Sequence, residues 1–226
     1  MTKIRVVTQA GMAAFLSARG DEGLILSALN IFMLGHLRKN RDFPTHSYFW
    51  CDGIFGIVFS RLNGHRVSKL RGAMLTQRLL EYHRGDSICV LGSLSDGARS
   101  LLTDREVVIA RHYPLPECEV EELSVLPIEL DTKAVLITLP SPKQELVALN
   151  LSERFPKANF YCIGGAMNML AHPELDCPAL LQRLGFEFLF RLRSDTRRRI
   201  VRLLDSMVQA TLNLGYLRRC RIEVLD

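Results

Sequence analysis

Apolar runs of strand length alternate with amphipathic stretches along most of the chain. The strand-like runs are Lys3–Thr8, His46–Cys51, Ser87–Leu91, Glu106–Ala110, Ala134–Thr138 and Asn159–Ile163. The amphipathic stretches have apolar residues at helical spacing, over 70–83, 97–103, 143–152 and 166–170. Nearly all-apolar strands need cover on both faces. The alternation therefore predicts an α/β, Rossmann-like fold with a mostly parallel sheet and helices on both faces.

Two further segments carry weaker signals. The stretch from Asp21 to about Lys39 is expected to form a helix, because its apolar residues Leu24, Ala28, Ile31, Leu34 and Leu37 recur at helical spacing. The stretch from Tyr113 to Pro127 has three prolines and four glutamates, and we expect a loop or a weak helix there.

The last part of the chain reads differently from the rest. Helical patterns occur over 178–184 and 186–193, and an Arg-rich segment continues as a helix to about Leu214. We therefore divide the chain into an α/β core, residues 1–181, and a basic helical C-terminal segment, residues 182–226. No repeat, low-complexity tract or clear linker separates them.

Composition narrows the class of protein. The chain has 226 residues, of which 48% are hydrophobic and 23% charged, as in an ordinary globular domain that folds without disulfides or metal. No apolar stretch approaches the roughly 18–20 residues of a membrane span, and we expect no signal peptide. The six cysteines show neither a Cys-x-x-Cys pair nor zinc-ligand spacing, which favours buried free thiols in a reducing cytosol.

Charge is unevenly distributed. The net charge of +5 comes entirely from residues 182–226, which hold ten Arg and five acids, whereas residues 1–181 are neutral. A local basic block predicts a polyanionic neighbour, which could be nucleic acid, anionic lipid or a phosphorylated substrate. The structural alternative is a basic helix packed on the domain with its arginines in solvent.

Four predicted strand ends carry polar or glycine-rich turns: Asp52-Gly53, Gly92–Gly97, Pro140–Glu145 and Gly164–Asn168. Ligands of parallel sheets bind beyond the carboxyl ends of the strands, and glycines there let a phosphate approach the backbone. The four turns together favour a nucleotide-type pocket, although each glycine turn alone carries little information.

The sequence lacks the motifs of several common nucleotide-binding, hydrolytic and metal-binding sites. Gly92–Gly97 is neither a Walker loop nor a dinucleotide fingerprint, and Ser93 is not in a nucleophile elbow. The chain has no Asp-x-Asp and no histidine cluster, and Glu174-Leu-Asp176 is the nearest relative of a metal-binding pair. We expect no metal and no cofactor, so a diphosphate would be met by helix N-termini and arginines.

Asp52 is the carboxylate of most interest. It ends an aromatic strand and precedes Gly53 and the apolar run 54–59. Apolar walls raise the pKa of a carboxyl group and suit it to act as a base. The structural alternative, a helix N-cap or turn aspartate, is favoured about twofold by the motif alone.

An ordered set of motifs resembles the WecG/TagA/CpsF glycosyltransferases, glycosyltransferase family 26. It consists of Pro140-Ser-Pro-Lys-Gln-Glu145, Cys162-Ile-Gly-Gly-Ala-Met-Asn-Met169, Leu184-Gly-Phe-Glu-Phe-Leu-Phe-Arg-Leu192 and Arg197-Arg-Arg199. Asp52-Gly53, Asn30, Arg71-Gly72 and Cys89–Gly92 match weaker family features. The resemblance covers roughly residues 24–200, and its specific part is residues 140–192.

The resemblance implies a metal-independent, inverting transfer of a sugar from a UDP-sugar. The donor would carry N-acetylmannosamine, its uronate or glucose, and the acceptor would be a sugar on a polyprenyl diphosphate, for a bacterial exopolysaccharide, capsule or cell-wall polymer. Asp52 would be the general base. The implied binding residues are Asn30, Gly53, Gly92, Lys143, Gln144, Glu145, Gly164, Gly165, Asn168, Arg191 and Arg198.

The same resemblance places the protein in the cytoplasm, peripheral on the inner face of the plasma membrane, with the basic segment toward an anionic membrane and the diphosphate. A homo-oligomer is left open. This chain departs from the family at Asn168, where the family has an Asp, and at Asp176, where it has an Arg. Further departures are Thr138 and Pro140, where the family has glycines, and Ala28, where the family has a Thr. The alternatives are a non-catalytic scaffold of the same fold and a nucleic-acid-binding protein, although we expect no nucleic acid because no docking module is visible.

Overall fold

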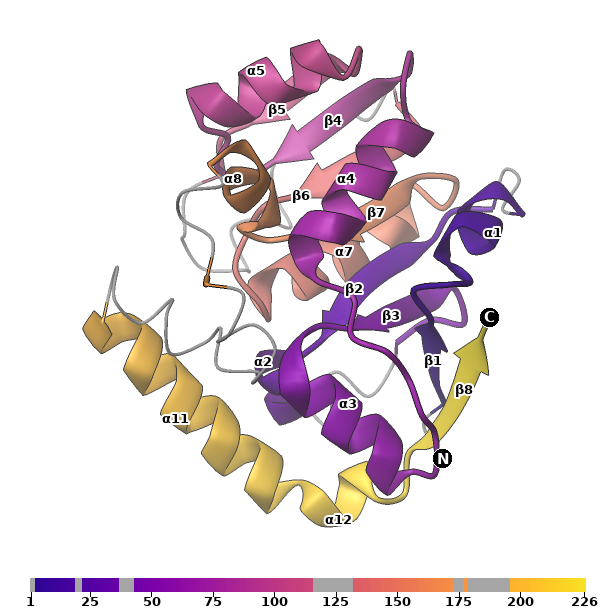
Figure 1. Cartoon of the computed structure of the whole chain (residues 1–226), viewed down its shortest axis with the longest axis vertical. Coiled ribbons are helices and arrows are strands. Elements are labelled where there is room, and N and C mark those ends of the chain that lie inside the picture. The colour runs from indigo at the N-terminus through magenta and orange to yellow at the C-terminus, as the bar shows by residue number, and fades with distance from the viewer. Residues whose placement is uncertain (1–2, 19–21, 37–42, 116–131, 173–176, 179–195) are drawn as a thin grey trace.

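The computed structural model describes the chain except residues 1–2, 19–21, 37–42, 116–131, 173–176 and 179–195. At its centre lies one eight-stranded sheet of order β5-β4-β6-β7-β2-β3-β1-β8 (Figure 1). All its strand pairings are parallel. The strands are β1 (Lys3–Val7), β2 (Ile25–Leu29), β3 (Ser47–Cys51), β4 (Ser87–Leu91), β5 (Val108–Tyr113), β6 (Ala134–Ile137), β7 (Asn159–Cys162) and β8 (Arg221–Leu225).

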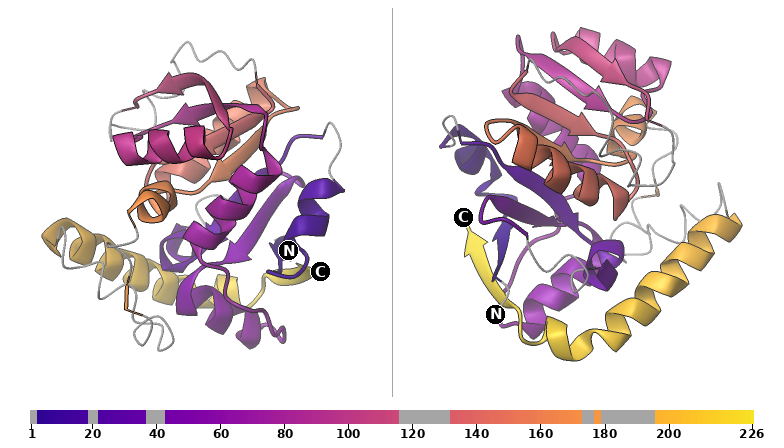
Figure 2. Two further views of the ribbon diagram at one scale, coloured as in Figure 1. Left: turned by 45° about the horizontal axis from the view of Figure 1, so that its top comes forward. Right: turned by 180° about the vertical axis from the view of Figure 1, so that it is seen from behind.

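Helices cover both faces of this sheet, so the predicted Rossmann-like α/β fold is confirmed (Figures 1 and 2). The described helices are α1 (Met12–Ser17), α2 (Ile31–His36), α3 (Gly53–Leu62), α4 (Gly72–Tyr82), α5 (Asp96–Asp104), α7 (Lys143–Arg154), α8 (Ala166–Ala171), α11 (Thr196–Leu212) and α12 (Leu214–Leu217). Side chains from α1, α4, α5 and α8 share one core cluster, and those from α7 and from α2 and α3 fill two others.

Alternation along the strands builds the two sides of the core. In β4, Ile88 and Val90 join the cluster under α4 and α5, while Cys89 and Leu91 join the cluster under α7. Strand side chains point alternately to opposite faces, so a strand buried on both faces is apolar throughout. This is why the central strands lack a polar face in the sequence.

The prediction of a helix over residues 21–39 is wrong. Residues 25–29 form β2, a fully buried strand between β3 and β7, and only Ile31–His36 is helical in the described part of this segment. A short continuous apolar run fits a helix and a two-sided buried strand equally well. The correction moves Asn30 from a helix interior to the carboxyl end of the central strand.

The C-terminal segment is not only helical. After α11 and α12 the chain returns to the sheet as β8, parallel to β1 at the edge, with Ile222 opposite Ile4. Glu223 fixes this strand through ion pairs with Lys3 (2.8 Å) and Arg5 (3.1 Å). The helical interpretation of the tail missed this strand, and the division at residue 181 stays a prediction. The patterns over 179–193 and most of 113–127 lie outside the described residues.

The long helix α11 packs on α2, along the outside of the molecule (Figure 2). The approach is close because α2 has a glycine there: a Cβ on Gly35 would lie 2.8 Å from the Ser206 carbonyl oxygen. Arg202 lies over the ring of Phe32 (4.9 Å to the centroid), and Asn213 donates to the Gly35 carbonyl (3.3 Å). The tail helix is therefore attached to the helix that follows β2.

We predict that Gly56→Ala destabilises the fold strongly. A Cβ at Gly56 in α3 would lie 2.1 Å from the carbonyl oxygen of Leu29, a backbone atom that cannot move aside alone. Overpacking of this kind typically costs about 1–3 kcal/mol of the free energy of unfolding. Chemical denaturation measures the loss. The matched control is Gly215→Ala, a helical glycine with open space around it, which should unfold like the wild type; equal midpoints for both variants would contradict the prediction.

Candidate functional site

The sheet topology brings sequence-distant turns to one edge. Along the carboxyl edge, the ends of β4, β6, β7, β2 and β3 follow one another. They carry, in that order, Gly92, the 138–145 turn, Gly164-Gly165, Asn30 and Asp52. With about 4.8 Å between neighbouring strands, this row spans about 19 Å. Strands β1–β3 lie on one side and strands β4–β7 on the other side of the boundary between β7 and β2, the switch point at which such sheets bind ligands.

Asp52 lies at the end of β3, in the N-cap position of α3, with extended backbone angles (φ −100°, ψ 122°). Asp52 thus has the N-cap position that the structural alternative predicts, but its side chain makes no capping hydrogen bond. The residue is half-buried. Together with burial, its charge raises the pKa of the adjacent Cys51 thiol. Asp52 therefore places a partly accessible carboxyl group at the site edge, next to the positive-φ residue Gly53 (φ 73°).

Asn30 follows β2 and starts α2. Its Oδ1 accepts a hydrogen bond from the Met33 backbone N–H (3.0 Å), and its carbonyl accepts one from Leu34 (2.9 Å). These contacts fix the side chain at the switch point, half-buried and beside the end of β7. Sequence reasoning chose the residue but not this role as a cap.

Gln144 and Glu145 lie in the first turn of α7 and are almost fully buried, at 3% and 0% exposure. Glu145 Oε1 accepts hydrogen bonds from Ser27 Oγ (2.5 Å), Ser141 Oγ (2.9 Å) and Gln144 Nε2 (2.9 Å). Burial raises the pKa of the Glu145 carboxyl, and these hydrogen bonds act in the opposite direction. Burial also raises the pKa of the Cys162 thiol, with a contribution from Glu145. Neither side chain offers a surface to a ligand in this conformation, in contrast to the half-buried Lys143.

The glycines at the edge differ in what they do. Gly92 (φ 113°) is buried, and a Cβ there would lie 2.6 Å from Thr138 Oγ1, so it serves close packing of two strand ends. Gly164 (φ 54°) lies over the 138–145 turn, where a Cβ would be 3.5 Å from the Leu139 carbonyl oxygen. Gly165 is exposed, and a Cβ on it would meet nothing within 4 Å. The open space above the edge therefore lies at Gly165 and Gly53.

Asn168 is tied to a neighbouring helix start. Its Oδ1 accepts a hydrogen bond from Ser95 Oγ (2.8 Å), and the same Ser95 Oγ caps α5 by accepting from the Ala98 N–H (3.2 Å). Arg198 belongs to α11, of which only the backbone is described at this position. Arg191 and Asp176 lie outside the described residues.

Sequence reasoning missed the hydroxyl groups that organise the edge. Thr138 Oγ1 donates to the Ser93 carbonyl (2.7 Å), and Ser27 and Ser141 join the Glu145 cluster described above. Ser27 is the polar residue inside the apolar β2. A buried polar side chain in an apolar strand needs a partner, which was the available signal.

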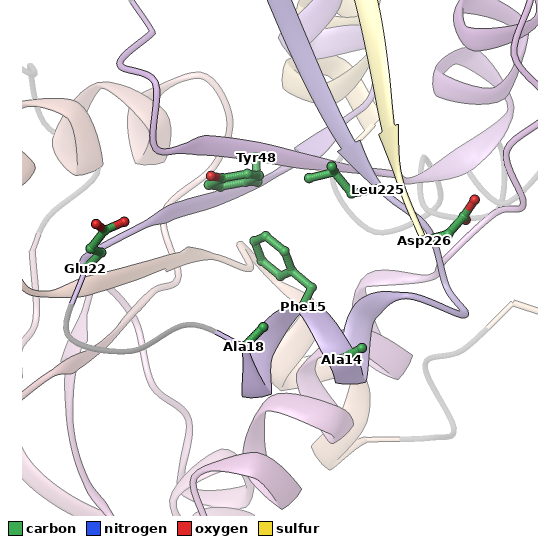
Figure 3. Close-up of a pocket in the computed structure, with 7 residues that line it drawn as sticks. All are labelled: Ala14, Phe15, Ala18, Glu22, Tyr48, Leu225 and Asp226. Carbon is green, nitrogen blue, oxygen red and sulfur yellow. The ribbon is translucent and has the colours of Figure 1, made fainter.

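A shallow pocket of about 750 Å³ lies elsewhere, at α1 (Figure 3). Its lining consists of Ala14, Phe15, Ala18, Glu22, Tyr48, Leu225 and Asp226. Phe15 and Tyr48 face each other with ring centroids 4.7 Å apart. None of the candidate-site residues lines this pocket, so it is distinct from the candidate site.

The described residues contain no group of three His, Cys, Asp or Glu side chains that could hold a metal ion. All five cysteines in the described part of the chain are free and buried, as the sequence predicted for them. Among the same residues, no helix has the length and apolarity needed to cross a bilayer.

Comparison with protein families gives a match over nearly the whole chain. The model of the glycosyl transferase WecG/TagA/CpsF family matches residues 1–221. The match therefore includes β1 and most of the C-terminal segment, beyond the residues that carried the motif resemblance. Agreement of the motifs, the parallel sheet and this match shows that the chain belongs to the WecG/TagA/CpsF glycosyltransferase family.

Proposed function

We propose that this glycosyltransferase moves a sugar from a UDP-sugar to a sugar linked to a polyprenyl diphosphate, with inversion at the transferred carbon. The observation that carries the proposal is the row of turns at the carboxyl edge, with Asp52 at one end and Gly92 at the other. A row of about 19 Å accommodates an extended nucleotide-sugar with an acceptor beside it. Open space at Gly165 and Gly53 lets ligand atoms approach the backbone.

In this proposal Asp52 acts as the general base. A carboxylate takes the proton from the acceptor hydroxyl as that oxygen attacks the sugar carbon, and the UDP group leaves from the opposite side. Asn30 already uses Oδ1 to cap α2, which leaves its Nδ2 group as the donor toward a ligand. Gly53, with its positive φ (73°), follows at the start of α3, and Asp52 itself is half-buried.

The diphosphate is proposed to lie near the starts of α4 and α7, two helices whose first turns reach the same edge and lack a side-chain cap. Free backbone N–H groups at a helix start attract anions. Arg71, which precedes α4, and Lys143, which starts α7, add positive charge there. Figure 1 shows the first turns of α11 on the side of the carboxyl edge.

The test is a transfer assay with a panel of UDP-sugars and a short polyprenyl-diphosphate-linked acceptor. Transfer from one donor, with the opposite anomeric configuration in the product, supports the proposal. Binding of UDP without transfer to any acceptor would favour the non-catalytic scaffold, for which the replacement of an acid by Asn168 is the supporting observation. Tight binding of nucleic acid, without binding of UDP-sugars, would favour the alternative of a nucleic-acid-binding protein.

We also predict that transfer does not need a divalent metal. The chain has no Asp-x-Asp, and helix starts with basic residues are proposed to meet the diphosphate charge instead. Activity should be the same before and after dialysis against EDTA. A loss that added Mg²⁺ or Mn²⁺ restores would show that the diphosphate site has been misassigned.

A further inference from the structure

The two oxygens of the Glu145 carboxyl group lie in very different surroundings. Oε1 accepts hydrogen bonds from Ser27, Ser141 and Gln144. Oε2 is sealed from solvent and has no hydrogen-bond partner among the described residues. The amide oxygen of Gln144 is sealed and without a partner in the same way. Two adjacent side chains thus leave two buried acceptors without a donor.

A count of the side-chain hydrogens in the cluster explains why no side-chain donor is left for them. Gln144 Nε2 uses its hydrogens on Glu145 Oε1 (2.9 Å) and Ser141 Oγ (2.8 Å). The hydroxyl hydrogens of Ser27 and Ser141 are both directed to Glu145 Oε1. An ionised carboxylate would therefore keep two sealed acceptors unsatisfied, which is costly in a protein interior. One added proton turns Oε2 from an acceptor into a donor, and Gln144 Oε1 is the unsatisfied acceptor of the cluster.

We infer that Glu145 is a protonated, neutral carboxylic acid that positions Gln144 and the 138–145 turn at the switch point. The inference deepens the proposed function and rests on it for the role of the site. Full burial of the side chain, which raises its pKa, agrees with the neutral form. A residue of this kind acts through its neighbours, since it has no exposed atom for a substrate.

The cluster joins the two halves of the sheet where they meet. Ser27 belongs to β2 in the N-terminal half, while Ser141 and Gln144 belong to the turn and helix after β6. One oxygen of Glu145 holds both sides. Loss of this link would let the 138–145 turn move relative to Asn30, which follows β2. Glu145 is therefore expected to affect transfer without touching the substrate.

A neutral form also suits an anionic ligand. A buried negative charge below the carboxyl edge would repel a diphosphate, because charges in a low-dielectric interior are poorly screened. The groups that face Glu145 are Ser27 of β2, Ser141 of the turn, Gln144 and the backbone N–H of Glu145 itself in α7, and Cys162 of β7, whose thiol donates to the Gln144 carbonyl (3.6 Å). Lys143, two residues earlier, is the charged neighbour along α7.

Infrared spectroscopy tests the protonation state without any substrate. At pH 7–8 the wild-type protein should show the carbonyl stretch of a protonated carboxyl group, and Glu145→Gln should lack it. The matched control is Glu153→Gln, an exposed residue of the same helix, which should keep the band. Absence of the band in the wild type, or its persistence in Glu145→Gln, would overturn the neutral form.

Thermal unfolding as a function of pH gives a second measurement. If folded Glu145 keeps a proton that the unfolded chain releases, rising pH favours the unfolded chain, from the ordinary glutamate pKa of about 4.3 up to the raised folded value. The Tm of the wild type should therefore fall with pH over this window relative to that of Glu145→Gln. Glu153→Gln should follow the wild type. Parallel curves for Glu145→Gln and wild type would contradict the inference.

Kinetics test the positioning role. Glu145→Gln keeps an acceptor oxygen and supplies donors where Oε2 lies, so it should retain more of kcat than Glu145→Ala, which removes the link. We expect Glu145→Ala to lose at least about tenfold in kcat while the Kd for UDP changes less. Wild-type kcat and KM in Glu145→Ala would overturn the role. If even the wild type transfers no sugar from any donor, the proposed function fails. The infrared and Tm measurements still decide the protonation state of Glu145 in that case.

Discussion

Asp52→Asn should fold like the wild type and lose about 10²–10⁴ in the rate of sugar transfer. The amide has the size of the carboxylate but cannot take up the proton of the acceptor hydroxyl, and removal of a general base typically costs this much. The side chain makes no capping hydrogen bond at the start of α3, so its replacement removes no such bond from the fold. A transfer assay at saturating donor, with Tm measured on the same samples, gives both results.

Asp104→Asn is the matched control for this experiment. Asp104 is the exposed last residue of α5, at the opposite end of the sheet from the candidate site, and its loss should leave transfer unchanged. Turnover near the wild-type rate in Asp52→Asn would remove this residue from the mechanism and leave it a turn role. A large fall in Tm would instead indicate that the aspartate stabilises the start of α3.

The protein should sediment with anionic liposomes at low salt, stay in solution with neutral liposomes, and be released from the anionic ones as salt rises. Residues 182–226 carry the whole net charge of +5. Each basic residue near an anionic leaflet contributes about 1 kcal/mol, so the segment supplies at most roughly 5 kcal/mol. Association of this strength is reversible and is weakened when salt screens the charges.

The described part of α11 refines this prediction, because it presents an exposed apolar stripe opposite the face that packs on α2. Its members are Val201, Leu204, Val208 and Leu212. Leu203 of the same helix is buried (8% exposed), whereas Met207 is exposed beside the stripe. An exposed apolar stripe along an otherwise polar helix is typical of a helix that lies in a membrane interface.

A single substitution tests whether the exposed stripe of α11 faces the membrane. Val208→Asp should weaken binding to anionic liposomes more than it weakens UDP binding. Val108→Asp is the matched control, since Val108 is equally exposed (56% against 54%) but lies on β5 at the far edge of the sheet. Truncation from residue 203 is a poorer test, because it also removes β8 from the sheet. Equal binding to neutral and anionic liposomes would contradict the electrostatic part, and no binding to either would leave α11 a packed helix.

The candidate site shows how far motif reasoning reached. Asp52, Asn30, Gly92 and the Gly164-Gly165 turn were chosen from separate parts of the sequence, and the topology puts all of them on one edge. Their roles differ from a simple list of ligand contacts. Gly92 packs against Thr138, and Glu145 is buried beneath the edge with Gln144. Proximity to substrate depends on burial, which a motif does not encode.

The sequence by itself determined the parallel α/β class, because continuous apolar strands separated by amphipathic helices allow few other arrangements. It also located most strands to within a few residues. It could not decide between helix and strand over 24–29, since a short continuous apolar run fits both the helical and the strand periodicity. Only pairing with β3 and β7 makes that segment the central strand.

The tertiary structure alone decided three further features. The strand order sets which turns are neighbours, and it brings Asn30 beside the turn after β7 although they are far apart in the chain. The return of the tail as β8 depends on the free edge of β1 and on the charges of Lys3 and Arg5 there. The Glu145 cluster depends on hydroxyl groups from β2 and from the turn after β6, which local patterns cannot connect. Each of these features is a contact between distant segments, and such contacts arise only when the sheet is assembled.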